Sequence, residues 1–160
     1  MHGPGGAQLG SDIFHNYAYT RGFSRWLSDM YDNPRFYHAY AEFILEMDLE
    51  YLERFLPPLA DVADVVVMGE DLGPQASTFM SPDIYRVFCK PYHARWTEAV
   101  RRLAPGRSIA LHSSGNVYPL IPDFIEIGIT ILNPVQPGAR SLDRCTDTND
   151  VDLHELGRKG

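Results

Sequence analysis

The chain has 160 residues, of which 44% are hydrophobic and 22% are charged, and its formal net charge is −7. This composition is typical of a globular domain with a hydrophobic core, and the acidic balance argues against a nucleic-acid partner. Two cysteines, Cys89 and Cys145, form no disulfide framework. The sequence shows no signal peptide and no apolar run of the ~20 residues that span a bilayer. We expect a single cytoplasmic domain over residues 1–160 that does not bind a membrane.

The first third of the chain predicts a loop region followed by two helices. Residues 1–12 are rich in glycine and predict irregular structure. The stretch HNYAYTRGF then predicts a loop that enters a helix over residues 23–31. A second helix is expected to begin at Pro34, with Asn33 as its N-cap. Its apolar residues recur with the helical period and predict a stripe that faces the core: Phe36, Tyr40, Phe43, Ile44, Met47, Tyr51 and Phe55.

Three short apolar runs, at residues 64–69, 108–112 and 129–133, predict buried strands. The segments between them predict a helix over residues 81–103, kinked at an internal proline, and a shorter helix over residues 118–128. Alternation of strand and helix is typical of an α/β protein with a parallel sheet and right-handed crossovers.

Polar side chains gather where these strands end. In parallel α/β folds the carboxyl ends of the strands open on one face, where ligands bind. We therefore expect one site at this rim, with His112 as its most informative member, because a strand that simply reaches solvent does not need a titratable ring. The polar residues at the three strand ends are Glu70, Asp71, His112, Ser113, Ser114, Asn133 and Gln136.

The remaining candidates for chemistry are interpreted as structural. We expect His38 and His93 to be surface or helix-packing residues. His15 lies in the expected loop, where packing is the favoured interpretation. Cys89 is expected to be a core thiol.

Three stretches of the chain resemble the uroporphyrinogen decarboxylase superfamily: RGFSRWLSDMYDNPRFYHAYAEFIL, VVVMGEDLGPQASTFMSPDIYRVFCKPYH and IALHSSGNVYPLIPDFIEIGITILNPVQPGAR. The resemblance covers about residues 20–140 and is closer to the branch of corrinoid-linked, zinc-dependent methyltransferases. It implies a (β/α)8 barrel, a small methylated or tetrapyrrole-related substrate and a corrinoid protein as a partner. It also implies catalytic roles for Asp71 and His112. Substrate contacts are implied for Glu70, Gln75, Ser114, Asn133 and Gln136.

The sequence departs from that methyltransferase branch at its metal site. His112 matches the first zinc ligand of the branch, but Ser114 stands where the branch has a cysteine. A neutral hydroxyl is a far poorer zinc ligand than a thiolate, and Cys145 is not at a matching position. We therefore do not expect tight zinc binding at this strand end.

The length of the chain predicts part of a barrel, because a complete one takes roughly 250 residues. The fold class expected is α/β, a partial TIM (β/α)8 barrel with alternating parallel strands and helices. Open sheet edges would favour self-association. Three functional hypotheses stay open: methyl transfer, decarboxylation of a porphyrinogen, and a binding module or fragment without catalysis.

Overall fold

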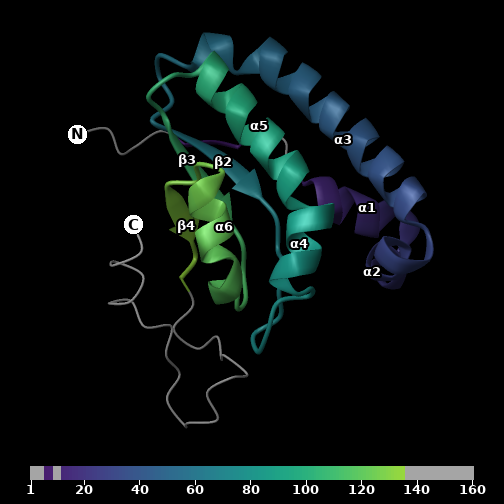
Figure 1. Ribbon diagram of the computed structural model, residues 1–160. Coiled ribbons are helices and arrows are strands. Elements are labelled where there is room, and N and C mark those ends of the chain that lie inside the picture. The colour runs from purple at the N-terminus through teal and green to yellow at the C-terminus, as the bar shows by residue number, and fades with distance from the viewer. Residues whose placement is uncertain (1–5, 9–11, 136–160) are drawn as a thin grey trace, which may run out of the picture.

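Four parallel strands form a single sheet in the order β1-β2-β3-β4 (Figure 1). The structure is a computed structural model that describes residues 6–8 and 12–135. The strands span Gly6–Gln8 (β1), Val65–Gly69 (β2), Ser108–His112 (β3) and Ile131–Asn133 (β4). Each neighbouring pair is parallel, so the predicted parallel arrangement of the three later strands is confirmed.

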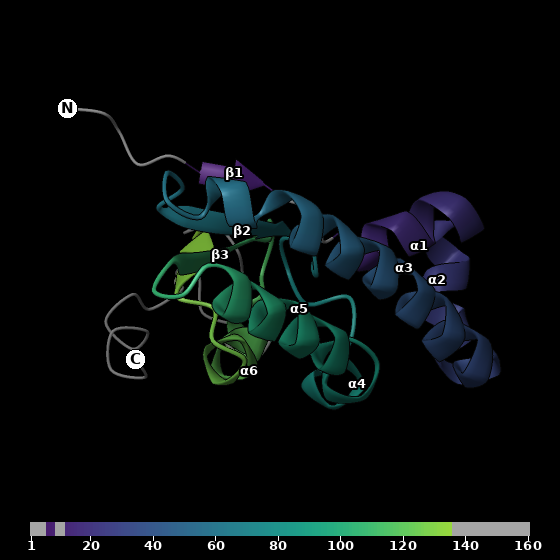
Figure 2. The ribbon, with the colours of Figure 1, turned by 90° about the horizontal axis from the view of Figure 1, so that it is seen from above.

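The helices follow the strands in the βα order that the sequence predicts. The long helices α3 and α5 lie side by side, and α6 lies in front of β4 (Figure 1). The view from above in Figure 2 places α5 and α6 on the same side of the sheet. None of the described helices is long and apolar enough to cross a membrane. The helices span Ile13–Arg21 (α1), Phe23–Asp32 (α2), Pro34–Phe55 (α3), Pro82–Phe88 (α4), Lys90–Leu103 (α5) and Ile121–Glu126 (α6), with short 3-10 turns at Pro57–Leu59 and Tyr118–Leu120.

The core lies between the helices and one face of the sheet. Alternate strand residues point to opposite faces, and on the helix-covered face Val66, Met68, Ile109 and Leu111 are each at most 1% exposed. Burying side chains of this size contributes roughly 1.5–3 kcal/mol each. The opposite face of the sheet, which includes the exposed Ile131, is not packed in this way.

Three expectations about the elements need correction. Residues 6–8 form a strand, and HNYAYTRGF lies mostly inside the helix α1 instead of a loop. The helix expected over residues 81–103 is broken at Cys89 into α4 and α5. The proline two residues later explains the break, because it lacks the N–H that a continuous helix would use and is favoured in the first turn of a new one.

The apolar stripe predicted on α3 is mostly on the wrong side of the helix. Of its members only Ile44 is buried, whereas Phe43 and Met47 are more than half exposed. The helix carries apolar residues on two faces, and contact with α5 and α1 decides which face is covered. The buried face consists of Tyr37, Ala41, Ile44, Leu45 and Leu52.

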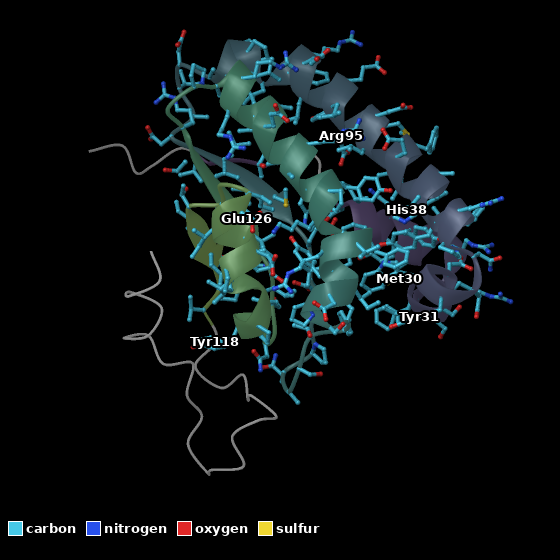
Figure 3. The ribbon with its side chains drawn as sticks, viewed as in Figure 1. Met30, Tyr31, His38, Arg95, Tyr118 and Glu126 are labelled. Carbon is cyan, nitrogen blue, oxygen red and sulfur yellow. The ribbon has the colours of Figure 1, made fainter. Side chains whose placement is uncertain are left out.

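His38 and Arg95, both labelled in Figure 3, connect α3 to the neighbouring helices. The His38 ring stacks on Phe88, and its Nδ1 lies 2.7 Å from the Tyr92 hydroxyl. Arg95 donates to both carboxylate oxygens of Glu42 at the helix surface. The interpretation of His38 as a helix-packing residue is confirmed.

A buried carboxylate, Asp29, fixes α1 against α2. It accepts hydrogen bonds from Arg21 Nε at 2.7 Å and from the Tyr17 hydroxyl at 2.8 Å, both on α1. Asn33 donates its side-chain amide to the same carboxylate, so it does not cap α3 with its side chain as expected. Because α1 carries residues of the site described below, this anchor also positions part of the site.

We predict that this anchor makes the fold sensitive to acid. The hydrogen bond from Arg21 is the main cause that lowers the pKa of Asp29 to about 2. Because the pKa of Asp29 is lower in the folded chain than in the unfolded chain, its ionised carboxylate stabilises the fold at neutral pH by about 2 kcal/mol. This contribution is lost as the pH falls from 4 through 2, because the carboxylate becomes protonated. Asp29→Asn should therefore be less stable than the wild type at pH 7, and the gap should close toward pH 2 in urea-unfolding curves.

The matched control is Asp83→Asn, since the side chain of Asp83 is 90% exposed. Its stability should follow that of the wild type at every pH. A gap between Asp29→Asn and the wild type that stays constant from pH 7 to pH 2 would contradict the prediction.

Candidate functional site

The register of the sheet divides the polar strand ends between its two faces. Gly69, His112 and Asn133 are paired across β2, β3 and β4, so the side chains of His112 and Asn133 share one face. Glu70 is one residue beyond Gly69, which turns its side chain toward the helices. We call His112 and Asn133, together with Asp71 and Ser114 in the loops that follow β2 and β3, the open-face site. The group on the second face, Asp12, His15, Glu70 and His93, is called the helix-side cluster.

His112 is the centre of the open-face site. The residue is exposed, and its Nδ1 lies 2.8 Å from Asn133 Oδ1. An amide oxygen only accepts hydrogen bonds, so Nδ1 donates to it, and in the neutral form of the ring Nε2 then has the lone pair. The neighbouring strand thus orients the imidazole and selects its tautomer, which is how a histidine is prepared to accept a proton.

Hydrogen bonds join the loop after β3 to the loop after β2. Asp71 Oδ1 accepts from the backbone N–H of Ser114 at 2.6 Å, and Ser113 Oγ accepts from the N–H of Leu72 at 3.2 Å. The N–H of Asn116 donates to the carbonyl of Pro74. These contacts bring Asp71 and Ser114 together, as the sequence predicts for residues at neighbouring strand ends.

Among the described residues, the predicted substrate-binding residues Glu70 and Gln75 are not part of this group. Gln75 is exposed in the loop after β2. Gln136 lies outside the described residues. Their roles stay predictions.

The expectation that Glu70 shares a cavity with His112 is wrong, because the carboxylate of Glu70 is buried among the helices. Its Oε1 accepts a hydrogen bond from the backbone N–H of Phe14 at 3.0 Å, and its Oε2 has no hydrogen-bond partner among the described residues. Burial is the main cause that raises the pKa of Glu70 well above its usual range. Successive side chains of a strand point to opposite faces, so the face that Glu70 occupies depends on the residue at which β2 ends.

His93 faces Glu70 from α5 and is fully buried, not at the surface. Its Nε2 lies 4.0 Å from Glu70 Oε1 and has no hydrogen-bond partner in the described part of the chain. Its Nδ1 lies 3.0 Å from the Tyr85 hydroxyl. Burial lowers the pKa of His93 to about 3, so its ring is neutral. The sequence offered no signal for this position beyond its place on a helix.

Asp12 and His15 complete the helix-side cluster at the start of α1. His15 Nδ1 lies 3.3 Å from Asp12 Oδ1, and this hydrogen bond is the main cause that raises the pKa of His15, with burial opposing it. Ligand atoms of Asp12, His15 and Glu70 all lie within 4.8 Å of one another. Sequence reasoning missed this group because α1 was expected to be a loop. The three-residue spacing of Asp12 and His15, which places both on one helix face, is the signal that could have found it.

The fold and the open-face site define an α/β protein that carries its polar residues at the carboxyl ends of parallel strands. The chain matches the uroporphyrinogen decarboxylase (URO-D) family over residues 14–152, and it belongs to that family. Among solved structures it is similar to a methyltransferase from Methanosarcina mazei, with a TM-score of 0.56 and 19% identity. A search of curated proteins found no match.

The structural similarity shows the fold and not the activity, because identity is low. It covers 80% of this chain and 34% of the methyltransferase chain. The four-stranded open sheet is consistent with part of a (β/α)8 barrel. The resemblance to the URO-D superfamily is confirmed, and the activity belongs to the proposal below.

We predict that the loop after β3 depends on the absence of a side chain at Gly115. This residue has a φ of +86°, and a Cβ there would lie 2.0 Å from the carbonyl oxygen of Gly73. Gly115→Ala should therefore separate the two loops and lower the free energy of unfolding by well over 1 kcal/mol, since strain and a backbone clash add. Urea unfolding measures the loss.

Gly106→Ala is the control. It has a similar φ of +80°, but a Cβ there would have nothing within 4 Å. It should show the conformational strain alone, about 1 kcal/mol. Equal destabilisation by the two substitutions would show that the close approach of the loops is not required.

Proposed function

We propose that the open-face site binds a small substrate and transfers a methyl group, as in the methyltransferase branch of the URO-D superfamily. The observation that carries the proposal is the pair of His112 and Asn133, which holds an exposed imidazole with Nε2 as the proton acceptor. The site lies at the carboxyl ends of parallel strands, where barrel enzymes carry their catalytic residues. The similarity in fold to a methyltransferase supports the choice of reaction.

In the proposed reaction the acceptor is a small thiol and the donor is a methyl-corrinoid. Nε2 of His112 takes the proton of the thiol as the sulfur attacks the methyl carbon. The S–C bond forms while the Co–C bond breaks, and the electron pair of that bond stays on cobalt, which goes from Co(III) to Co(I). The Asn133 amide oxygen stabilises the imidazolium that forms, and the carboxylate of Asp71 adds negative charge at the same rim.

A zinc centre of the methyltransferase branch does not fit the donor set at this strand end. His112 contributes one nitrogen, and Ser114 offers only a hydroxyl where a thiolate would be needed. Cys89, the cysteine among the described residues, is buried beside Tyr37 and Met80. The reaction is therefore assigned to proton transfer by the imidazole, with no step through zinc.

The proposal also concerns the edge strands of the sheet, β1 and β4. Within the described part of the chain, strands β1 and β4 each pair on one side only, and an apolar hollow lies beside β4. We propose that a further barrel segment or a second copy of the chain covers this edge, because exposed strand edges favour pairing. A corrinoid protein would bring the methyl donor to the open face. The hollow is lined by Ile121, Phe124, Ile125, Ile129, Thr130, Ile131, Leu132 and Val135.

The test is anaerobic demethylation of methylcobalamin by 2-mercaptoethanol, followed by visible absorption with the full chain present. The wild type should accelerate the reaction above the rate without protein. His112→Ala should reduce that acceleration by about 10²-fold or more, because a positioned general base contributes roughly 10²–10⁴. Asn133→Ala should reduce it less, since the base remains but loses its orientation.

His38→Gln is the control, because it removes an imidazole from the helix layer and should keep the full rate. Circular dichroism verifies that each variant is folded. Equal rates for the wild type and His112→Ala would contradict methyl transfer at this site. Tight binding of uroporphyrin that is lost in His112→Ala would instead favour the decarboxylase branch. Absence of both methyl transfer and uroporphyrin binding would favour a module without catalysis.

A further inference from the structure

The helix-side cluster brings four potential metal ligands together from three separate parts of the chain. Asp12 and His15 lie one turn apart at the start of α1, Glu70 follows β2, and His93 lies on α5. The cluster is on the opposite side of the sheet from His112. It therefore does not include His112, the proposed base of the methyl transfer, although the negative charge of Asp71 reaches His15 and helps to raise its pKa.

Among the described residues, two buried atoms in this cluster have no hydrogen-bond partner. They are Glu70 Oε2 and His93 Nε2, and neither side chain has exposed surface. A buried polar atom without a partner destabilises the fold. The 4.0 Å between His93 Nε2 and Glu70 Oε1 is too long for a direct hydrogen bond. The two groups therefore face each other without satisfying each other.

We propose that Asp12, His15 and Glu70 bind a divalent transition-metal cation, with His93 Nε2 as a fourth ligand. Such an ion would satisfy both unpartnered atoms at once. Two carboxylates would balance its charge, and two imidazoles favour Zn²⁺ or Co²⁺ over Ca²⁺ and Mg²⁺, which prefer oxygen ligands.

Among Asp12, His15 and Glu70 the distances are close to those that a tetrahedral ion requires, and His93 would have to move toward these three to become the fourth ligand. Metal–ligand bonds of about 2.0–2.1 Å place ligand atoms roughly 3.3 Å apart. Asp12 Oδ1 and His15 Nδ1 are already 3.3 Å apart, and the ligand atoms of Asp12, His15 and Glu70 are all within 4.8 Å of one another. Small rotations of the His15 and Glu70 side chains would close the remaining difference.

The surroundings of the cluster supply the contacts that orient metal ligands. The N–H of Phe14 holds Glu70 Oε1, which leaves Oε2 for the ion. Nδ1 of His93 can donate to the Tyr85 hydroxyl, the tautomer that leaves a lone pair on Nε2. Partners of this kind fix ligand geometry in metal proteins. The side chains of His15 and Asp12 are 26% and 46% exposed, which gives an ion a path from solvent.

The experiment is a titration of the full chain with Co²⁺, followed by visible absorption, and with Zn²⁺ against a competing chelator. The wild type should bind one ion per chain, and the ion should raise its melting temperature. His15→Ala and Asp12→Asn should each weaken binding at least 10-fold and remove most of the rise in melting temperature. Both residues are partly exposed, so the variants should fold.

Two controls separate this site from others. Asp83→Asn removes an exposed carboxylate from α4, and His112→Ala removes the imidazole of the open-face site; neither should change the affinity. Absence of stoichiometric binding to the folded wild type would overturn the proposal. Binding that survives His15→Ala but is lost in His112→Ala would also overturn it, because the ion would then lie on the other face of the sheet.

Discussion

The parallel register of β2, β3 and β4 is the constraint on which both polar groups depend. It places Gly69, His112 and Asn133 side by side on one face. Because strand residues alternate between faces, Glu70 then points into the helix layer. A shift of one residue in this register would exchange the faces of every side chain in the strand. The pairing of β2 with β3 and β4 therefore places His112 in the open-face site and Glu70 in the helix-side cluster.

The helix layer and the loops hold these strand ends in place. The buried carboxylate of Asp29 fixes α1, and α1 in turn presents the N–H of Phe14 to Glu70. On the other side, the bond from the N–H of Ser114 to Asp71 joins two loops that are 43 residues apart in the sequence. Stability and site geometry therefore share the same contacts, which is why Gly115 is expected to affect both.

The sequence was sufficient to predict the elements whose signal is local. The run that ends at His112 is continuously apolar, and its bounds as a strand are confirmed. The face of the sheet on which Glu70 lies could not be predicted, because it depends on where β2 ends. The covered face of α3 could not be predicted either, since both faces are apolar and the packing partners decide between them. The helix α1 lacks an amphipathic pattern, and its tertiary contacts with α2 and α3 support it instead.

Membership of the URO-D family gives the fold, and the arrangement of His112 gives the proposed chemistry. The account depends on a neutral imidazole that donates from Nδ1 to Asn133 and keeps Nε2 unprotonated. Long-range ¹H–¹⁵N correlation spectra of the histidine rings, with His112 assigned by its loss in His112→Gln, measure this directly. The account predicts the Nδ1–H tautomer for neutral His112, and a shift away from it in Asn133→Ala. A neutral His112 that carries its proton on Nε2 would contradict the account.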